Sequence, residues 1–308
     1  MRDSTKFYID KCKMYIDFML SHGQFSGLSK PVIESWIKNF DSNSDEELTL
    51  AYSLLVKFIY FSENDLVTML EEGVEKLYHN SIINSQIDAN FTLSSNALRG
   101  IKNEVLQTML FLPLLDEDSP HESGNYIMRL LVSNNIISSN QSIGYNKLEE
   151  TIGDKYNHII IVDDCLGSGT QLFDFWNNYE LNNGKTLRSF CAENKLKVTY
   201  LVLFGYDKSI KSLNSTFDDL DIVCVRQLSD CQRIFADDSY MWDSNEKRDK
   251  YKNLLKTISE ENSFDLTGFS EFDFAFAMHD TIPDWSLPLF WKERDSWTPL
   301  LRRKNSRD

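Results

Sequence analysis

Short apolar segments alternate with helix-like segments through the middle of the chain, and this alternation constrains the fold more than any other feature. The apolar segments lie at 105–115, 158–164, 197–206 and 221–228. Strands that alternate with helices favour parallel pairing through right-handed crossovers. Strands that are apolar along their whole length need helices on both faces of the sheet. The sequence therefore predicts an α/β fold built around a parallel sheet.

The segments on either side of this core have other patterns. Residues 1–103 have the apolar spacing of amphipathic helices, which predicts a helical N-terminal region. We assign the core to 104–228, and we assign 229–308 to an insertion and a C-terminal extension, rich in Trp and Pro, that completes the core. A last strand is expected within 272–279. The tryptophans of the extension, which we expect to be packed in a core, are Trp285, Trp291 and Trp297.

Two helices of the N-terminal region have start signals. Ser29 is a suitable N-cap, and Pro31 follows it at a position where a missing N–H costs little. Ser62 precedes Asp65 by three residues, which is a variant of the capping box. We therefore expect helices to begin directly after Ser29 and Ser62.

Composition narrows the range of partners. The chain has 308 residues and a formal net charge of −15, which argues against broad binding to nucleic acid or to an anionic membrane surface. It has no run of apolar residues long enough to span a bilayer, so we predict no membrane segment. The five cysteines are odd in number and lack a C-x-x-C motif, which favours reduced thiols and a cytoplasmic location.

The most informative motif, DDCLGSGT, ends the predicted strand at 158–164. Asp163 and Asp164 stand at the carboxyl end of that strand, the edge where open parallel sheets bind their ligands. The glycine-rich turn at 167–170 leads into a helix, whose N-terminal N–H groups favour a phosphate. Two acids suit sugar hydroxyls or a hydrated Mg²⁺ ion. A phosphate beside a diol describes a phosphorylated ribose.

The two acids need not do the same work. Adjacent residues of a strand point to opposite faces, so Asp163 and Asp164 reach one ligand only if the backbone turns sharply there. Without such a bend, one of the two acids is structural.

Three other interpretations of the turn fit the sequence less well. A P-loop requires G-x-x-x-x-G-K-[ST] upstream, whereas Gly-Lys-Thr occurs only downstream at 184–186 and position 179 is Tyr. A dinucleotide-binding turn requires a third glycine, and Leu172 occupies that position. A turn with glycines for geometry alone would explain Gly167 and Gly169 but leaves the acids unexplained.

Residues 163–170 resemble the ribose-phosphate motif of type I phosphoribosyltransferases. That family has a hydrophobic strand, two acids, two variable residues and then Thr-Gly-x-Thr. Asp163 and Asp164 match the acids, and 168–170 approximates the phosphate-binding end, although the position between Gly and Thr is missing or shifted. The resemblance implies a Rossmann-like phosphoribosyltransferase core. It also implies a ribose-phosphate site formed by Cys165, Leu166, Gly167, Ser168, Gly169 and Thr170.

The same family has a second loop, which holds pyrophosphate after the first core strand. The resemblance places it within 116–126, and the candidate residues are His121, Glu122, Ser123, Gly124 and Asn125. Family members usually supply Lys or Arg there, but this segment is acidic at 116–118. Pyrophosphate would then need Mg²⁺ or remote cations such as Arg129, Lys147 or Lys155 to offset the repulsion. The resemblance also implies a flexible loop at 138–147.

A closer resemblance covers nearly the whole chain. The stretches WIKNFDSNSDEELTLAYSLLVKFIYFSENDL, the motif strand and MHDTIPDWSLPLFW are similar to phosphoribosyltransferase-like proteins predicted in bacterial conflict systems. Those proteins are thought to act in antiviral defence, sometimes beside a retron reverse transcriptase. Many end in His-Asn-Thr-Pro-Asn-Asn-x-Leu-Pro, and this chain follows that outline from His279, with Asp at 280 and 284 in place of Asn. His279 and Asp280 are therefore candidates for a pocket.

Two functional hypotheses follow from the resemblance. In the first, the chain is an enzyme and toxin-like effector of anti-phage defence that binds 5-phosphoribosyl pyrophosphate (PRPP) or a nucleotide with Mg²⁺. Asp163 and Asp164 would be catalytic and would hold the metal. In the second, the chain is an inactive nucleotide sensor or regulatory subunit that acts through partners, such as a reverse transcriptase or a DNA-binding subunit. Both hypotheses allow the chain to form a homodimer.

Overall fold

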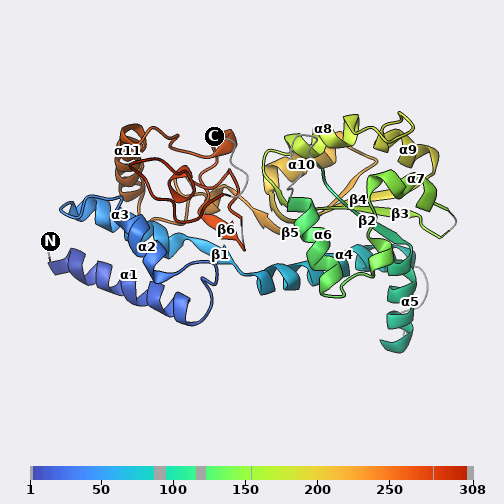
Figure 1. Cartoon of the computed structure of the whole chain (residues 1–308), viewed down its shortest axis with the longest axis horizontal. Coiled ribbons are helices and arrows are strands. Elements are labelled where there is room, and N and C mark those ends of the chain that lie inside the picture. The colour runs from blue at the N-terminus through green and yellow to red at the C-terminus, as the bar shows by residue number, and fades with distance from the viewer. Residues whose placement is uncertain (1–2, 87–94, 116–122, 154, 280, 304–308) are drawn as a thin grey trace. The chain divides into compact units, whose positions relative to one another are not determined.

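The structure is a computed structural model of the chain that describes residues 3–86, 95–115, 123–153, 155–279 and 281–303, with the backbone alone for 80–86 and 95–98. The chain forms two compact units (Figure 1). The first unit comprises Met1–Leu66 and Ser229–Asp308, and the second comprises Val67–Leu228. The predicted segment 1–103 is therefore shared between the units, and 229–308 belongs to the same unit as the N-terminus.

A four-stranded parallel sheet in the order β2-β3-β4-β5 forms the centre of the second unit. Its strands are β2 (Met109–Pro113), β3 (His158–Leu166), β4 (Lys197–Tyr206) and β5 (Asp221–Leu228). The register pairs Val162 with Leu201 and Asp163 with Val202. This sheet confirms the predicted α/β fold class.

One strand boundary differs from the prediction. Residues 105–107 were expected in a strand, but they end helix α5 (Ser95–Gln107), and β2 starts at Met109. Ile101 and Val105 lie four residues apart, so they fall on one face of the helix and continue it. Short apolar runs of this kind fit a helix end and a buried strand equally well.

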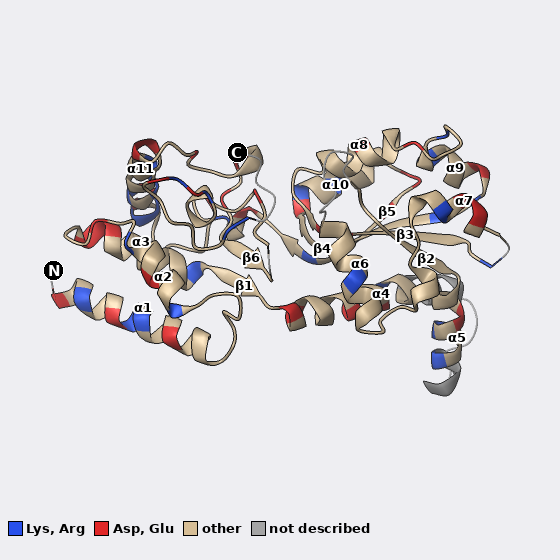
Figure 2. Ribbon diagram, viewed as in Figure 1, with Lys and Arg blue, Asp and Glu red and all other residues tan. Residues whose placement is uncertain are grey.

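Helices cover both faces of the sheet. The remaining helices with residues in this unit are α4 (Glu63–Gln86), α6 (Ser123–Ser133), α7 (Leu148–Thr151), α8 (Thr170–Asn178), α9 (Leu187–Glu193) and α10 (Asp207–Thr216), with short 3₁₀ turns η1 (Ser139–Gln141) and η2 (Tyr145–Lys147). One core packs Ile161 and Tyr200 against side chains of α8, α9 and α10. In Figure 1, α4 and α6 lie across the sheet from α8 and α10. Figure 2 shows the charged residues mostly on helices and loops, with uncharged ribbon through β2 and the centre of β4.

The first unit joins the two ends of the chain. Its main elements are α1 (Asp3–Ser21), α2 (Lys30–Ile37), α3 (Asp45–Lys57), β1 (Ile59–Phe61), α11 (Asn245–Glu261) and β6 (Phe276–Met278), with 3₁₀ turns η3 (Asp230–Gln232), η4 (Phe269–Glu271) and η5 (Pro288–Phe290). The expected last strand is β6, but it pairs in parallel with β1 in a separate two-stranded sheet. All three tryptophans of the extension are buried, as predicted.

The predicted helix starts also agree with the structure. Helix α2 follows Ser29, although the Ser29 side chain makes no capping hydrogen bond. At the start of α4 the backbone N–H of Ser62 donates to Asp65 at 2.7 Å, and the N–H of Asp65 donates to the Ser62 hydroxyl at 3.2 Å. This reciprocal pair forms the capping box.

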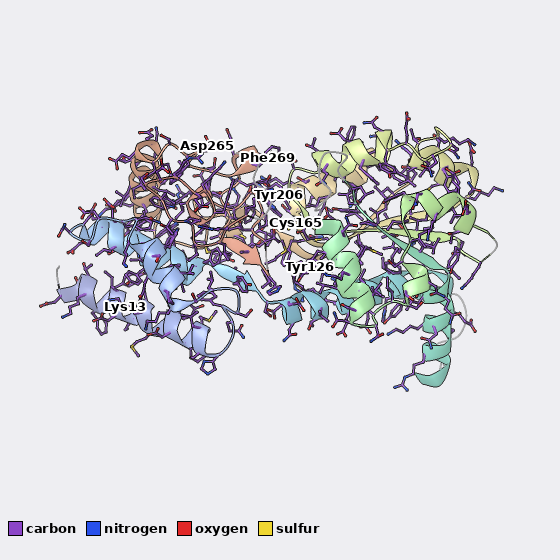
Figure 3. The ribbon with its side chains drawn as sticks, viewed as in Figure 1. Lys13, Tyr126, Cys165, Tyr206, Asp265 and Phe269 are labelled. Atoms are coloured by element: carbon purple, nitrogen blue, oxygen red, sulfur yellow. The ribbon has the colours of Figure 1, made fainter. Side chains whose placement is uncertain are left out.

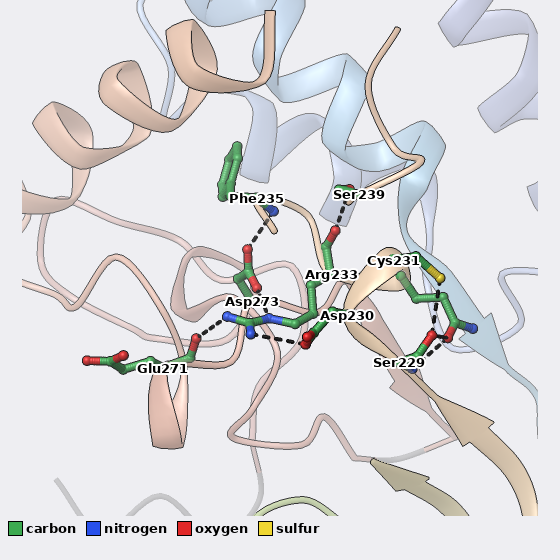
Figure 4. A network of polar contacts seen from close by, with 9 residues as sticks. Ser229, Asp230, Cys231, Arg233, Phe235, Ser239, Glu271 and Asp273 are labelled. Carbon is green, nitrogen blue, oxygen red and sulfur yellow. Dashed lines mark hydrogen bonds and ion pairs between the residues drawn. The ribbon is translucent and has the colours of Figure 1, made fainter. Parts of the chain in front are cut away.

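A buried ion pair fixes the insertion to the segment before β6 (Figure 4). Asp273 is 2% exposed, and it accepts hydrogen bonds from Arg233 Nε at 2.6 Å and from the backbone N–H of Phe235 at 2.5 Å. Arg233 also donates to the carbonyl oxygen of Glu271 at 2.7 Å. The charge of Asp273 is therefore well compensated inside the unit.

Within the described part of the chain, no helix combines the length and the apolar character that crossing a membrane requires.

Candidate functional site

The two acids of the motif lie within strand β3, which continues through them to Leu166. Asp163 is 3% exposed, whereas Asp164 is half-buried. The strand runs straight through both acids, and the Ser123 hydroxyl lies within hydrogen-bonding reach of both carboxylates. The two acids therefore differ in exposure, although both lie beside the start of α6.

Asp163 is held on both of its carboxylate oxygens. The hydroxyl of Ser123 donates to Asp163 Oδ1 at 2.8 Å, and the backbone N–H of Asp164 donates to the same oxygen at 2.9 Å. The hydroxyl of Tyr200 donates to Asp163 Oδ2 at 2.9 Å. One buried side chain thus connects β3 with α6 and β4.

Burial makes this pair of acids hard to ionise. Desolvation raises the pKa of the Asp163 carboxyl well above its usual value, and the nearby charge of Asp164 raises it further. Desolvation also raises the pKa of Asp164, and hydrogen bonds from Ser123 and from the backbone act in the opposite direction. Burial beside Asp163 raises the pKa of Tyr200. A bound cation or the hydroxyl donors of a sugar would therefore favour the ionised pair.

The turn after the acids has a conformation that suits a phosphate. Gly169 has a φ of +85°, in the left-handed region that favours glycine, and it forms the N-cap of α8. The Ser168 hydroxyl accepts a hydrogen bond from the Thr170 N–H at 3.3 Å and lies 3.1 Å from the Thr170 hydroxyl. Both hydroxyl side chains are exposed, beside a helix start whose first N–H groups lack intrahelical acceptors. Leu166, in contrast, is packed in the core.

The segment predicted to hold pyrophosphate is described only from Ser123 onward, so His121 and Glu122 lie outside the described residues. Ser123, Gly124 and Asn125 form the first turn of α6. A Cβ added at Gly124 would lie 2.7 Å from the carbonyl oxygen of Leu114, so glycine allows α6 to start against the end of β2. The structure thereby brings the end of the predicted second loop to the motif, through the bond from Ser123 to Asp163.

Sequence reasoning did not find Tyr200 as part of this site. The available signal was a tyrosine within an otherwise apolar strand, because a buried tyrosine hydroxyl usually needs a hydrogen-bond partner. Figure 3 labels three other residues near this edge of the unit, namely Cys165 on β3, Tyr206 on β4 and Tyr126 on α6. None of the five cysteines, all of which lie in the described part, forms a disulfide.

The other residues that the sequence suggested are the pocket candidates at 279 and 280, the remote cations and the loop at 138–147. His279 belongs to the first unit, where its Nε2 lies 3.3 Å from Glu63 and its backbone N–H donates to Phe61 at 2.8 Å. Asp280 lies outside the described residues. Of the remote cations, Arg129 lies over the ring of Tyr126 at 5.1 Å. The segment 138–147, predicted to be a flexible loop, contains η1 and η2, and the side chain of Gln141 is buried there.

The two acids could supply only some of the ligands that a metal ion needs. Among the described residues, no group of three or more His, Cys, Asp or Glu side chains is placed to bind one. Asp163 already accepts three hydrogen bonds, so Asp164 is the better-placed carboxylate. This donor set fits a Mg²⁺ ion that is coordinated mainly by water and by the phosphates of a ligand.

A parallel sheet with two acids and a glycine-rich turn at the carboxyl end of one strand fits the phosphoribosyltransferase-like class of protein. Residues 33–303 match the PRTase-CE family, and the chain belongs to that family. The resemblance to phosphoribosyltransferase-like proteins is thereby confirmed.

Two further comparisons add little to this assignment. Among solved structures, orotate phosphoribosyltransferase from Aeropyrum pernix is similar at 15% sequence identity and a TM-score of 0.24, over 56% of this chain and 84% of that chain. A likeness at that level carries no argument about function. No curated protein matches the chain in sequence.

Proposed function

We propose that the second unit binds a phosphorylated ribose, either PRPP or a nucleotide, at the carboxyl end of β3. The observation that carries the proposal is the sequence of features along one segment, with a half-buried acid at Asp164 and an exposed hydroxyl turn at 168–170. The 5′-phosphate would lie at this turn and at the start of α8, where N–H groups and hydroxyls are available as donors. The ribose diol would donate to the carboxylate of Asp164.

Magnesium is the metal ion that best suits this ligand. Asp164 would hold it together with water and phosphate oxygens, and the ion would offset the negative charge of the ligand beside two acids. A formal net charge of −15 also adds a long-range repulsion that such an ion would reduce.

The proposed activity is the making or breaking of a bond at the anomeric carbon of the ribose. The chain would contribute mainly by positioning the ligand and by electrostatic stabilisation of the leaving group. On the resemblance to conflict-system proteins, we propose that it acts as a cytoplasmic effector of anti-phage defence that depletes or modifies nucleotides.

The second candidate function is a nucleotide sensor or regulatory subunit without turnover. Two observations favour it. Both oxygens of Asp163 are engaged within the protein, and the sequence is acidic at 116–118, where active relatives usually supply cations. Such a subunit would act through partners, for example a reverse transcriptase or a DNA-binding subunit, and its homodimerisation is a separate question.

Binding is tested by calorimetry of the full chain with PRPP, ribose 5-phosphate and AMP, each with and without Mg²⁺. Thr170→Glu places a negative charge at the start of α8, where it favours the helix but repels a phosphate. The matched control is Ser189→Glu, which makes the same change in the first turn of α9. We expect Thr170→Glu to weaken binding about tenfold or more, equivalent to about 1.4 kcal/mol, and the control to leave it unchanged.

Mass spectrometry of the same mixtures separates the two functions. Consumption of the ligand supports the enzyme, and tight binding without consumption supports the sensor. If the wild-type chain binds none of the three ligands at millimolar concentration, or if Thr170→Glu binds as well as wild type, the proposed site is wrong.

A further inference from the structure

The two acids of the motif differ in what surrounds them. Asp163 is 3% exposed and receives donors from Ser123, Tyr200 and its own neighbour's backbone. Asp164 is half-buried, so part of its side chain remains exposed. At 3% exposure, with both oxygens already accepting hydrogen bonds, Asp163 offers little access to a ribose hydroxyl.

We infer that Asp163 is a positioning residue that ties the start of α6 to the motif strand, and that Asp164 alone meets the ribose. This inference rests on the proposed ligand and divides the roles of the two acids within its site. It also explains why a fully buried carboxylate is present next to one that is only half-buried.

The geometry shows what Asp163 positions. Ser123 is the first residue of α6, and its hydroxyl donates to Asp163 from 40 residues away in the sequence. Gly124 allows the same turn of α6 to approach the backbone of Leu114 at the end of β2. The first turn of α6 is thus fixed both to β2, by close packing, and to β3, by the carboxylate of Asp163.

Tyr200 completes the arrangement from the other neighbouring strand. Its hydroxyl donates to Asp163 Oδ2 at 2.9 Å, and the Tyr200 side chain is 1% exposed. Because this bond occupies the second oxygen, the carboxylate is held in one orientation with Oδ1 toward Ser123. Ser123 also lies close enough to Asp164 to hydrogen-bond with it, so the placement of α6 bears on the acid that faces the ligand.

The test uses hydrogen exchange of peptides from 123–133 together with binding of ribose 5-phosphate. We expect Asp163→Asn and Ser123→Ala each to speed exchange in the first turn of α6 and to weaken binding about three- to tenfold. The double variant should bind no more weakly than Ser123→Ala alone, because that change already removes the bond between Ser123 and Asp163. Asp164→Asn should change the exchange of α6 less than Asp163→Asn does, and it should weaken binding by more than tenfold.

Other results overturn the inference. Exchange of α6 at the wild-type rate in Asp163→Asn, or additive losses of affinity in the double variant, would show that Asp163 does not act through Ser123. If Asp163→Asn folds poorly, Tyr200→Phe keeps the carboxylate and removes one donor, and the same two readouts apply. Exchange of α6 does not depend on a ligand, so it tests Asp163 even if the wild-type chain binds no phosphorylated ribose and the proposed function fails.

Discussion

Substituting Gly124 by alanine tests whether the close approach of α6 to β2 holds the site together. The added Cβ would lie 2.7 Å from the Leu114 carbonyl oxygen and 3.0 Å from the Leu114 nitrogen. The shorter distance falls about 0.7 Å below ordinary van der Waals contact, and backbone atoms of a buried strand end cannot move aside easily. Relief therefore requires α6 to move away from β2 by several tenths of an ångström.

That movement bears directly on Ser123. Its bond to Asp163 is 2.8 Å long, and lengthening it by about 0.6 Å would exceed the usual range of a hydrogen bond. A buried carboxylate that loses one donor costs about 1–3 kcal/mol, and the helix propensity of alanine returns less than about 1 kcal/mol. We expect Gly124→Ala to lower the free energy of unfolding by about 1–2 kcal/mol and to weaken binding of ribose 5-phosphate.

Urea unfolding measured by far-UV circular dichroism provides the assay, and Gly100→Ala is the matched control. Gly100 lies in α5, and a Cβ there would meet no atom within 4 Å. The control should be neutral or stabilising by up to about 1 kcal/mol, because it gains helix propensity without a clash. If Gly124→Ala is as stable as Gly100→Ala and binds ligand normally, the close approach does not position Ser123.

Three further predictions concern other parts of the chain. Gly169→Ala places a side chain at a φ of +85°, so it should lower the unfolding free energy by about 1–2 kcal/mol in the same urea assay; an unchanged midpoint would contradict the observed turn. Asp273→Asn should destabilise the first unit by about 2–3 kcal/mol, because Arg233 loses its charged partner; a thermal melt of the variant beside wild type measures this, and equal melting points would refute it. Burial lowers the pKa of His158 to about 3 in the folded chain, whereas in the unfolded chain its pKa is near the ordinary value of about 6.5. As pH falls below about 6.5 the unfolded chain binds a proton that the folded chain does not, so the free energy of unfolding decreases. Wild type should therefore lose about 2 kcal/mol more between pH 7 and pH 5 than His158→Gln does, and parallel pH profiles would show that His158 is charged in the fold.

The sheet was predictable because most of its strands are nearly continuous apolar runs. Both β4 and β5 begin and end at the predicted residues. A charged residue marks the start of each strand, and an apolar or aromatic residue is the last of each. Strand β1 was not predicted, because three residues are too few to show a period. Its pairing with β6 joins segments from opposite ends of the chain, and no local pattern carries that information.

The candidate site was predictable where it is local and not where it is assembled. The acids and the turn occupy consecutive positions, so their chemistry is visible in the sequence. The bonds from Ser123 and Tyr200 to Asp163 join residues 40 and 37 positions apart in the sequence, and they depend on how the strands align. The sequence left open whether the two acids share one role, and the hydrogen bonds that distinguish Asp163 come from residues far away in the chain.

The first unit contains both ends of the chain, and this has a consequence for synthesis on the ribosome. Trp36 donates its indole N–H to the carbonyl oxygen of Leu289, a partner 253 residues later. Strand β1 likewise pairs with β6, which is synthesised near the end of the chain. The segment 67–228 leaves the ribosome in full before those partners exist, so it can fold while the N-terminal helices still lack part of their core. A chain that terminates early would therefore carry a finished sheet and an incomplete first unit, with apolar surface open to chaperones and proteases.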